Sequence, residues 1–285
     1  MYPPKFDYYR ATSLAEAVSL LRQHSGAKVL AGGHSLIPVM NLRLADPGTL
    51  IDIGRISELK GISAGNGSVR IGALTPHALI AASADVPAVL SEAAGMIGDP
   101  QVRNRGTIGG NIAHADPASD LPTVLIALGA KIHVTGPNGN RTILADDFFT
   151  GLFATALADG EIVTAVEVVK SGAGSGSAYT KLFNPASRYA MVGAAAIVTV
   201  SGGNCTAAGV AVGGLVPSAT RAKSVEAALV GKPLSEDNIA AAAQAVLNDL
   251  GDDVIGDIHA SAEYRQAMAP VFVKRALTAA AQRAK

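Results

Sequence analysis

The chain has 285 residues, of which 49% are hydrophobic and 16% charged, with 23 basic and 23 acidic side chains. This composition is typical of a globular protein and excludes a disordered one. Because the formal net charge is zero and no Lys/Arg-rich run occurs, nothing indicates a nucleic-acid partner. The N-terminus lacks the apolar core of a signal peptide, and no run of about 18 apolar residues predicts a transmembrane segment.

In the N-terminal part, residues 13–24 have the apolar spacing of a helix whose N-cap is Ser13. Helical patterns also cover 77–98, interrupted at Pro87, and 123–128. Short apolar runs separated by Gly and Asn predict strands. These strands are expected at 27–33, 48–56, 67–74, 130–136, 141–148 and 160–169.

The segment 171–177, "SGAGSGS", has the composition of a flexible linker. Beyond it, a three-stranded meander is expected at 178–183, 189–200 and 205–215, followed by helices at 219–231, 235–250 and 262–284. The expected fold class is α+β. Its domains are 1–175, with two lobes and a soft boundary near residue 55, and 176–285.

Two glycine-rich segments carry the functional signal. The first, "LAGGHS" from Leu30 to Ser35, joins a strand to a helix that Ser35 is expected to cap. The second, "RNRGTIGGNIAHADPASDLP", begins at Arg103. Backbone N–H groups in a tight glycine turn next to a helix start form an anion site, so the pair could hold the two phosphates of a dinucleotide. The alternative is two unrelated turns.

The sequence contains no motif for another kind of nucleotide site or for a metal site. The chain has no GxxxxGK[ST] sequence, and "GAGSGS" does not fit the GxGxxG fingerprint. The six histidines show no metal-ligand spacing, so no metal is expected. The single cysteine, Cys205, excludes a disulfide framework and fits a reducing compartment. It also means that this chain alone cannot hold an iron–sulfur cluster, which needs about four thiolates.

Together, the two segments at this spacing resemble the FAD-binding medium subunits of molybdenum hydroxylases, most closely the carbon monoxide dehydrogenase branch. The resemblance extends over essentially the whole chain. It implies a two-lobed FAD-binding domain of the vanillyl-alcohol-oxidase type, followed by a C-terminal α+β domain with a three-stranded antiparallel sheet and helices. It also implies non-covalent FAD, although a histidine like His34 carries the flavin covalently in some relatives of the wider fold.

When the motifs of the family are matched to this sequence, the resemblance assigns residues to the FAD site. It assigns no catalytic residue. The first segment would wrap the diphosphate, the second would hold its other side and the ribityl chain, and the remaining residues would contact the flavin or its sugar. These cofactor-binding residues are Leu30, Ala31, Gly32, Gly33, His34, Ser35, Leu36, Ile97, Thr107, Gly109, Gly110, Asn111, Asp120, Ile162, Val163, Lys181 and Tyr189.

Several of these assignments have plain structural alternatives. Asp120 could be a carboxylate that merely begins a helix. Lys181 could be a solvated lysine on a strand, and Tyr189 an ordinary core or surface aromatic. Ile162 and Val163 are explained equally well by a buried strand.

In function, the resemblance implies an oxidoreductase subunit that transfers electrons. Substrate would be oxidised at a molybdenum–pterin centre in a large partner subunit. Electrons would pass through two two-iron two-sulfur clusters of a small partner to FAD here, and then to a quinone or NAD. The implied assembly is a dimer of heterotrimers, expected in the cytoplasm, either free or peripheral at the inner face of the membrane.

Two other classes of function stay open. The chain could be a self-sufficient FAD-dependent oxidase or dehydrogenase, although no cap domain or catalytic base is recognisable. It could also be a non-catalytic nucleotide-binding or assembly protein. The substrate of the complex is not determined by this sequence.

Overall fold

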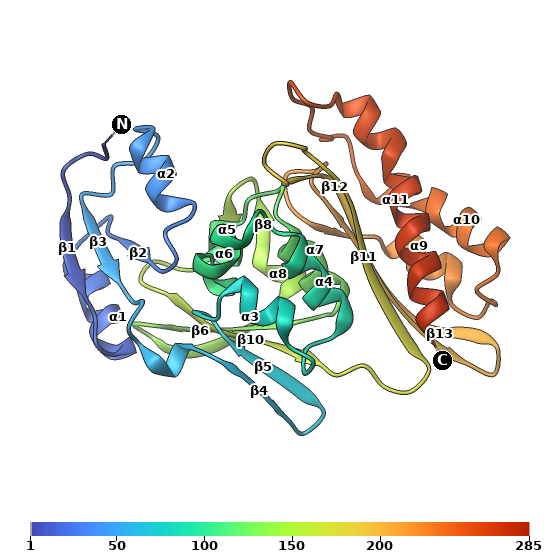
Figure 1. Cartoon of the computed structure of the whole chain (residues 1–285), viewed down its shortest axis with the longest axis horizontal. Helices are drawn as coiled ribbons and strands as arrows, with labels where there is room; N and C mark the ends of the chain where they lie inside the picture. The colour runs from blue at the N-terminus through green and yellow to red at the C-terminus, as the bar shows by residue number, and fades with distance from the viewer. Residues whose placement is uncertain (1, 285) are drawn as a thin grey trace.

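Three sheet-centred parts follow one another along the long axis of the molecule (Figure 1). The computed structural model describes residues 2–284. The N-terminal lobe holds a parallel sheet in the order β1-β3-β2. Its elements are β1 (Asp7–Arg10), α1 (Leu14–Gln23), β2 (Lys28–Leu30), α2 (Leu36–Asn41) and β3 (Thr49–Asp52).

The middle lobe is built on an antiparallel sheet in the order β4-β5-β10-β6-β7. Its strands are β4 (Ile62–Gly65), β5 (Ser68–Gly72), β6 (Lys131–Gly136), β7 (Gly139–Leu144) and β10 (Ile162–Val169), with a small hairpin of β8 (Phe149–Gly151) and β9 (Ala154–Thr155). Its helices are η1 (Ser57–Leu59), α3 (His77–Ala82), α4 (Ala88–Met96), α5 (Pro100–Arg105), α6 (Ile108–His114), α7 (Asp120–Ala127) and α8 (Ala145–Phe148).

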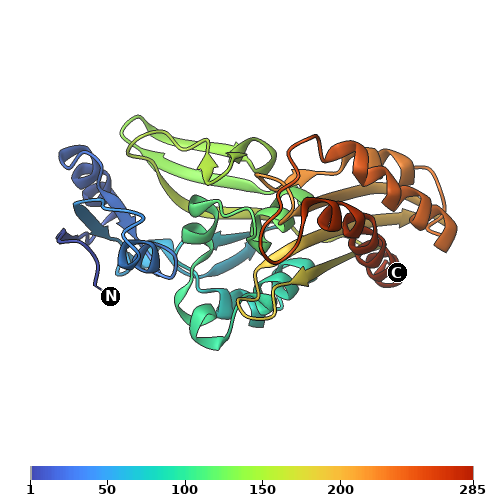
Figure 2. The same cartoon turned by 90° about the horizontal axis from the view of Figure 1, so that it is seen from above.

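The C-terminal domain has a four-stranded antiparallel sheet in the order β11-β12-β13-β14. Helices cover its outer face, with α11 packed along β11 and β12 (Figures 1 and 2). The elements are β11 (Ser175–Phe183), β12 (Ala190–Ser201), β13 (Asn204–Gly213), β14 (Thr220–Arg221), α9 (Lys223–Leu229), α10 (Glu236–Gln244), η2 (Ala245–Asp249) and α11 (Ala262–Arg283).

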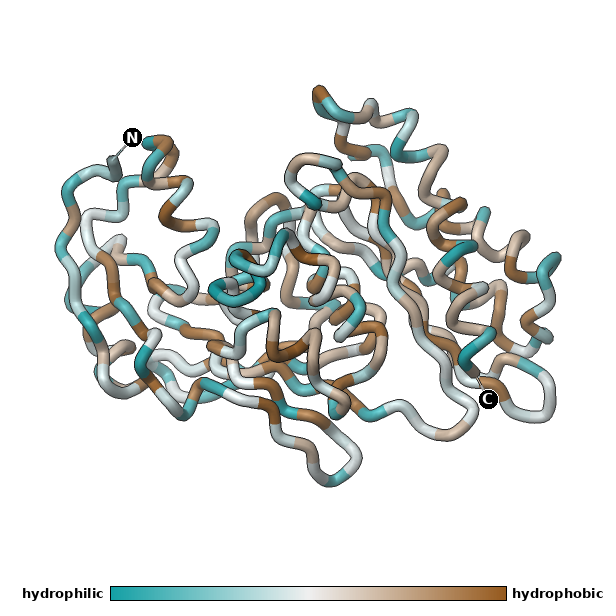
Figure 3. The backbone as a smooth tube through the Cα atoms, in the orientation of Figure 1, coloured by the Kyte–Doolittle hydropathy of each residue, from teal (hydrophilic) through white to brown (hydrophobic). Residues whose placement is uncertain are grey.

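Strand β12 shows why this sheet is buried on both faces. Side chains alternate across a strand, so Ala194 and Ala196 face the outer core with α9 to α11, while Ala195 faces the core shared with the middle lobe. Helix α7 lies between the two sheets, and all eight of its residues are buried. The hydrophobic stretches of the tube in Figure 3 follow these buried strands and helices. The helical side of the middle lobe thus packs against the C-terminal sheet through a shared core.

Most predicted elements are present, including the N-cap Ser13, whose side chain accepts from the N–H of Glu16 at 3.2 Å. Strands β1, β4, β8 and β9 were not predicted. The three-stranded C-terminal meander is extended by β14, a two-residue edge strand. The predicted linker is shorter than expected because β11 begins at Ser175, where Gly176 packs directly against the α11 backbone. No helix within residues 2–284 has the length and apolarity needed to cross a bilayer.

Candidate functional site

A cleft of about 770 Å³ lies where the three parts of the molecule meet. The N-terminal lobe contributes the segment between β2 and α2, the middle lobe contributes α6 and its neighbours, and the C-terminal domain contributes the turn before β12. The predicted cofactor-binding residues that line this cleft are Ala31, Gly32, Gly33, His34, Ser35, Leu36, Ile97, Thr107, Gly109, Gly110, Asn111, Asp120, Ile162, Val163 and Tyr189. Two predicted residues, Leu30 and Lys181, do not line it.

The first glycine segment presents free backbone donors to this cleft. Within the described residues, none of the N–H groups from Gly32 to Ser35 donates a hydrogen bond to the protein. Gly33 has φ +73°, a conformation that favours glycine. Gly32 is required for another reason, since a Cβ there would collide with the carbonyl oxygen of Arg105. Free donors in a fixed concave segment are suited to an anion.

Ser35 does not cap α2 through its side chain, contrary to the prediction. Its backbone is in the right-handed helical region, φ −109° and ψ −51°, whereas an N-cap residue is usually extended. Ser35 instead lines the cleft, with its hydroxyl near the Tyr189 phenol.

The second glycine segment is helical rather than a loop. Thr107 is the N-cap of α6, and its Oγ1 accepts from the N–H of Gly110 at 3.2 Å. The N–H of Gly109 donates to the carbonyl of Ala73 at 2.8 Å. Asn111 shares two hydrogen bonds with Ser119, at 2.6 and 2.9 Å. This segment therefore offers the cleft a smooth glycine surface at Gly110 rather than a run of free donors.

Asp120 stands at the inner end of the cleft in a buried polar cluster. It is 4% exposed and accepts hydrogen bonds from Tyr179 Oη at 2.6 Å and Lys181 Nζ at 2.9 Å. Burial raises the pKa of Asp120, and the positive charge of Lys181 opposes this rise. Burial likewise raises the pKa of Tyr179 well above its usual value, so both the phenol and the ammonium act as donors. Asp120 thus joins the middle lobe to β11.

Lys181 lies behind Asp120 rather than on the cleft wall. Its ammonium also donates to the carbonyls of Met96 at 3.0 Å and Arg188 at 2.7 Å, so all three N–H groups have partners in the protein. Its influence on a molecule in the cleft passes through Asp120 and through the turn that carries Arg188.

Aromatic residues surround the mouth of the cleft. Tyr189 is 45% exposed. Partial burial of its side chain raises the pKa of its phenol, and the negative charges of Asp116 and Asp120 add to this rise. Phe153 also lines the cleft and stacks on His114 with ring centroids 5.2 Å apart. Phe153 and Arg188 have φ +52° and +64°, unusual for residues other than glycine. Phe153 was not predicted, because nothing in its sequence context marks it.

His77 is a second cleft residue that sequence analysis missed. It is 3% exposed at the start of α3, and its Nδ1 is sealed from solvent without a hydrogen-bond partner in the described part of the chain. Burial lowers the pKa of His77 to about 4, with the nearby charge of His34 adding to this effect. Its imidazole is therefore neutral at physiological pH. A lone histidine in an apolar helix pattern gave no sequence signal.

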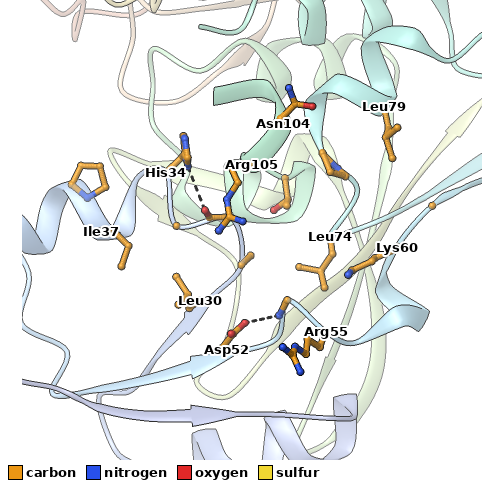
Figure 4. Close-up of a pocket in the computed structure, with 18 of the residues that line it drawn as sticks. Leu30, His34, Ile37, Asp52, Arg55, Lys60, Leu74, Leu79, Asn104 and Arg105 are labelled. Atoms are coloured by element: carbon orange, nitrogen blue, oxygen red, sulfur yellow. Dashed lines mark hydrogen bonds between the residues drawn. The ribbon is translucent and has the colours of Figure 1, made fainter. Parts of the chain in front are cut away.

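A neighbouring pocket of about 810 Å³ shares residues of the first glycine segment with this cleft (Figure 4). Leu30 lines this pocket instead of the main cleft. Arg55, Lys60 and Arg105 extend around it in Figure 4, and His34 Nδ1 lies 3.3 Å from the carbonyl oxygen of Gly32. The glycine segment, from Ala31 to His34, therefore lines both cavities.

Across residues 2–284, no group of three or more His, Cys, Asp or Glu side chains is placed to hold a metal ion. Cys205 is a buried free thiol in the C-terminal core.

Two family models match the chain. Residues 4–169 match the FAD binding domain in molybdopterin dehydrogenase, and residues 177–280 match the CO dehydrogenase flavoprotein C-terminal domain. The chain is 43% identical to the carbon monoxide dehydrogenase medium chain of Hydrogenophaga pseudoflava, over 98% of each chain. It is 39% identical to the 6-hydroxypseudooxynicotine dehydrogenase complex subunit alpha of Paenarthrobacter nicotinovorans, over 100% of this chain and 97% of the other.

The fold agrees with a solved relative. A structure of carbon monoxide dehydrogenase from Hydrogenophaga pseudoflava, lacking the Mo-pyranopterin moiety of its molybdenum cofactor, superimposes with a TM-score of 0.96 at 45% identity. The match covers 100% of both chains. Similarity at this level extends over both domains and the cleft between them.

Proposed function

This chain belongs to the family of FAD-binding flavoprotein subunits of molybdopterin dehydrogenases, and from that membership we propose that it binds FAD non-covalently and transfers electrons within a molybdenum hydroxylase complex. The observation that carries the proposal is the run of free N–H groups from Gly32 to Ser35 on the wall of a cleft large enough for a dinucleotide. The two-lobed arrangement around this cleft supports the vanillyl-alcohol-oxidase type of fold.

The donor set fits the diphosphate of FAD. The N–H groups from Gly32 to Ser35 would bind its oxygens, and Gly110 would let the cofactor approach α6 without a side chain between them. Leu36, Ile97, Ile162 and Val163 would supply apolar contacts. The glycine segment itself would bind through the geometry of its backbone N–H groups, and Lys28 and Arg188 also line the cleft.

Asp120 would orient the sugar or ribityl hydroxyls of the cofactor. Tyr179 and Lys181 hold its carboxylate from behind, so its direction into the cleft is fixed before any ligand arrives. Tyr189, at the mouth, would cover the flavin ring and limit the access of water. When bound, FAD supplies reversible one- and two-electron redox chemistry, which this chain's own side chains lack.

We further propose the partners of this chain by family membership. They are a large molybdenum-binding subunit and a small subunit with two-iron two-sulfur clusters, assembled as a dimer of heterotrimers in the cytoplasm, free or at the inner face of the membrane. Leu30, which lines the neighbouring pocket, would support the glycine segment rather than contact the cofactor. The electron acceptor would be a quinone or NAD.

The visible spectrum of the purified chain, before and after acid precipitation, tests the cofactor assignment. A flavin spectrum whose chromophore stays in the supernatant is the expected result. Yellow colour in the pellet would indicate covalent attachment at His34 and would favour a self-sufficient oxidase. A colourless protein that takes up no added FAD would refute the proposed function.

Copurification tests the assembly. We expect the chain, expressed with its neighbouring subunits, to elute with a molybdenum-containing and an iron–sulfur protein. Substrate turnover by the chain alone, without these subunits, would contradict the assignment as an electron-transfer component.

A further inference from the structure

His77 occupies the space between the two glycine segments. Its backbone N–H donates to the carbonyl of Gly106 at 3.0 Å, and its ring lies against the Cα of the same glycine. The residue is 3% exposed, and its buried Nδ1 makes no hydrogen bond within residues 2–284. A buried polar group without a partner is uncommon in a folded protein and calls for an explanation.

The two ring nitrogens have different surroundings. Nδ1 is sealed from solvent and has no acceptor within reach. A Cβ on Gly106 would lie 2.9 Å from Nε2, so this nitrogen adjoins a glycine that itself lines the main cleft. Nε2 is therefore the nitrogen on the side of the cleft, and Gly106 keeps a side chain from standing in front of it.

This asymmetry selects one tautomer. A neutral imidazole carries one N–H and one bare nitrogen. A buried N–H without an acceptor is rarer and more costly than a bare acceptor without a donor. The proton therefore belongs on Nε2, and the bare nitrogen is Nδ1. His77 then presents a neutral donor next to the cleft.

We propose that His77 is a cofactor-binding residue whose Nε2–H donates a hydrogen bond to a diphosphate oxygen of FAD. The inference rests on the proposed function and adds a residue to its site. The position favours the diphosphate over the flavin ring, because His77 adjoins Gly106, and Gly106 in turn lies against Gly32 of the first glycine segment. A hydrogen bond to a charged oxygen is about twice as strong as one between neutral groups.

Substitution of the ring tests the donor. His77→Leu removes the N–H and should raise the dissociation constant of FAD by about tenfold or more. The same substitution should weaken the binding of ADP, a probe for the diphosphate, by a similar factor. His77→Gln keeps an N–H donor and should recover most of the affinity.

Thr123→Val is the matched control. Thr123 Oγ1 is also buried without a partner, but Thr123 does not line the cleft. This variant should bind FAD as the wild type does. If His77→Leu also binds FAD with wild-type affinity, His77 is a packing residue and the inference is wrong.

Nitrogen NMR of the wild-type chain provides a test that needs no substitution. The His77 ring should show the Nε2–H tautomer in the cofactor-free protein, and its Nε2 signal should shift when FAD is added. A proton on Nδ1, or an unchanged Nε2 signal, would overturn the assignment. If the wild type binds no FAD at all, the proposed function fails and this inference falls with it. If the wild type binds FAD normally but the His77 signal does not respond to FAD, only this inference is refuted and the proposed function stands.

Discussion

Gly109 and Gly110 are adjacent in sequence, yet the structure requires each for a different reason. A Cβ on Gly109 would lie 2.5 Å from the Cβ of Ala73 and 2.8 Å from its carbonyl oxygen. A Cβ on Gly110 would lie 3.0 Å from Thr107 Oγ1, a side-chain atom, and 3.7 Å from the Cβ of Ala31 on the cleft wall. Gly109 therefore serves the packing of α6 on the sheet, and Gly110 serves the space for a ligand.

Substitutions at these two positions should separate folding from binding. Gly110→Val should abolish FAD binding and lower the melting temperature of the cofactor-free protein less than Gly109→Ala does, because the added Cβ meets only the Thr107 hydroxyl and no backbone atom. Gly109→Ala should instead destabilise the protein by about 1–3 kcal/mol, although alanine normally favours a helix, because the collision is with backbone. FAD titration and thermal unfolding distinguish the outcomes. A folded Gly110→Val variant with normal flavin content would contradict the placement of the cofactor.

His77 should make the stability of the cofactor-free protein depend on pH. Its pKa is about 4 in the fold and near 6.5 when exposed, so the unfolded chain binds more protons between these values. Stability should be constant above about pH 6.5 and fall as the pH falls towards 4, by about 3 kcal/mol from this residue. Urea unfolding at several pH values checks this. His77→Leu should flatten the curve, and an unchanged slope would disprove the attribution.

At the scale of elements, sequence periodicity located most helices and strands but misjudged their junctions. The "TIGGN" segment was expected to be a loop, yet it forms the first turn of α6, because Thr107 caps it and Gly109 packs on Ala73. Ser35 was expected to cap α2 with its side chain and does not. These details depend on neighbours distant in sequence, which local patterns do not contain.

Helix α11 is anchored at its start by an ion pair that local patterns did not indicate. Arg265 is 4% exposed, donates to the carbonyl of Gly214 at 2.6 Å, and pairs with Asp257 at 2.5 Å. Burial disfavours ionisation of Asp257. This effect of burial is outweighed by the hydrogen bonds that Asp257 accepts from Arg265 and from the N–H groups of His259 and Ala260. Together they lower the pKa of Asp257 to about 2.

Removing this pair should destabilise the C-terminal domain. Asp257→Asn leaves the Arg265 guanidinium without a counter-charge and should cost about 2 kcal/mol, a moderate value because the Asp257 side chain is 44% exposed. Because the pKa of Asp257 is lower in the fold than in the unfolded chain, its carboxylate stabilises the folded protein above pH 4. This stabilisation is lost as the pH falls towards 2. Denaturant unfolding measures both effects. Glu236→Gln, which removes a more exposed pair with Lys274, is the control and should change stability little. Equal effects of the two variants would contradict this account.

For the whole molecule, the Asp120 cluster joins two domains at the cleft. Asp120 begins α7 in the middle lobe, whereas Tyr179 and Lys181 belong to β11 of the C-terminal domain. The side chains of Asp120 and Lys181 are 5% and 3% exposed. Opening of the domain interface would therefore separate a buried charge pair.

Lys181→Met should destabilise the protein by about 3 kcal/mol at pH 8, because it leaves the Asp120 carboxylate buried without its cation. Burial raises the pKa of Asp120, so protonation in the fold should reduce this cost as the pH falls. Combining Lys181→Met with Asp120→Asn should restore part of the stability. A double-mutant cycle by urea unfolding at pH 8 and pH 5 measures the coupling. Additive effects at both pH values would show that the pair does not couple the domains.

The sequence by itself determined the family, the cofactor class and the order of the elements. Two glycine segments at a characteristic spacing and the apolar periodicity are local features, which a single chain displays directly. Only the tertiary structure decided which side chains meet. It brought His77 and Phe153 to the cleft, placed Leu30 in the neighbouring pocket, and paired Lys181 with Asp120. Such contacts join residues that lie tens of positions apart, and burial and hydrogen-bond satisfaction select them only once the three sheets have packed together.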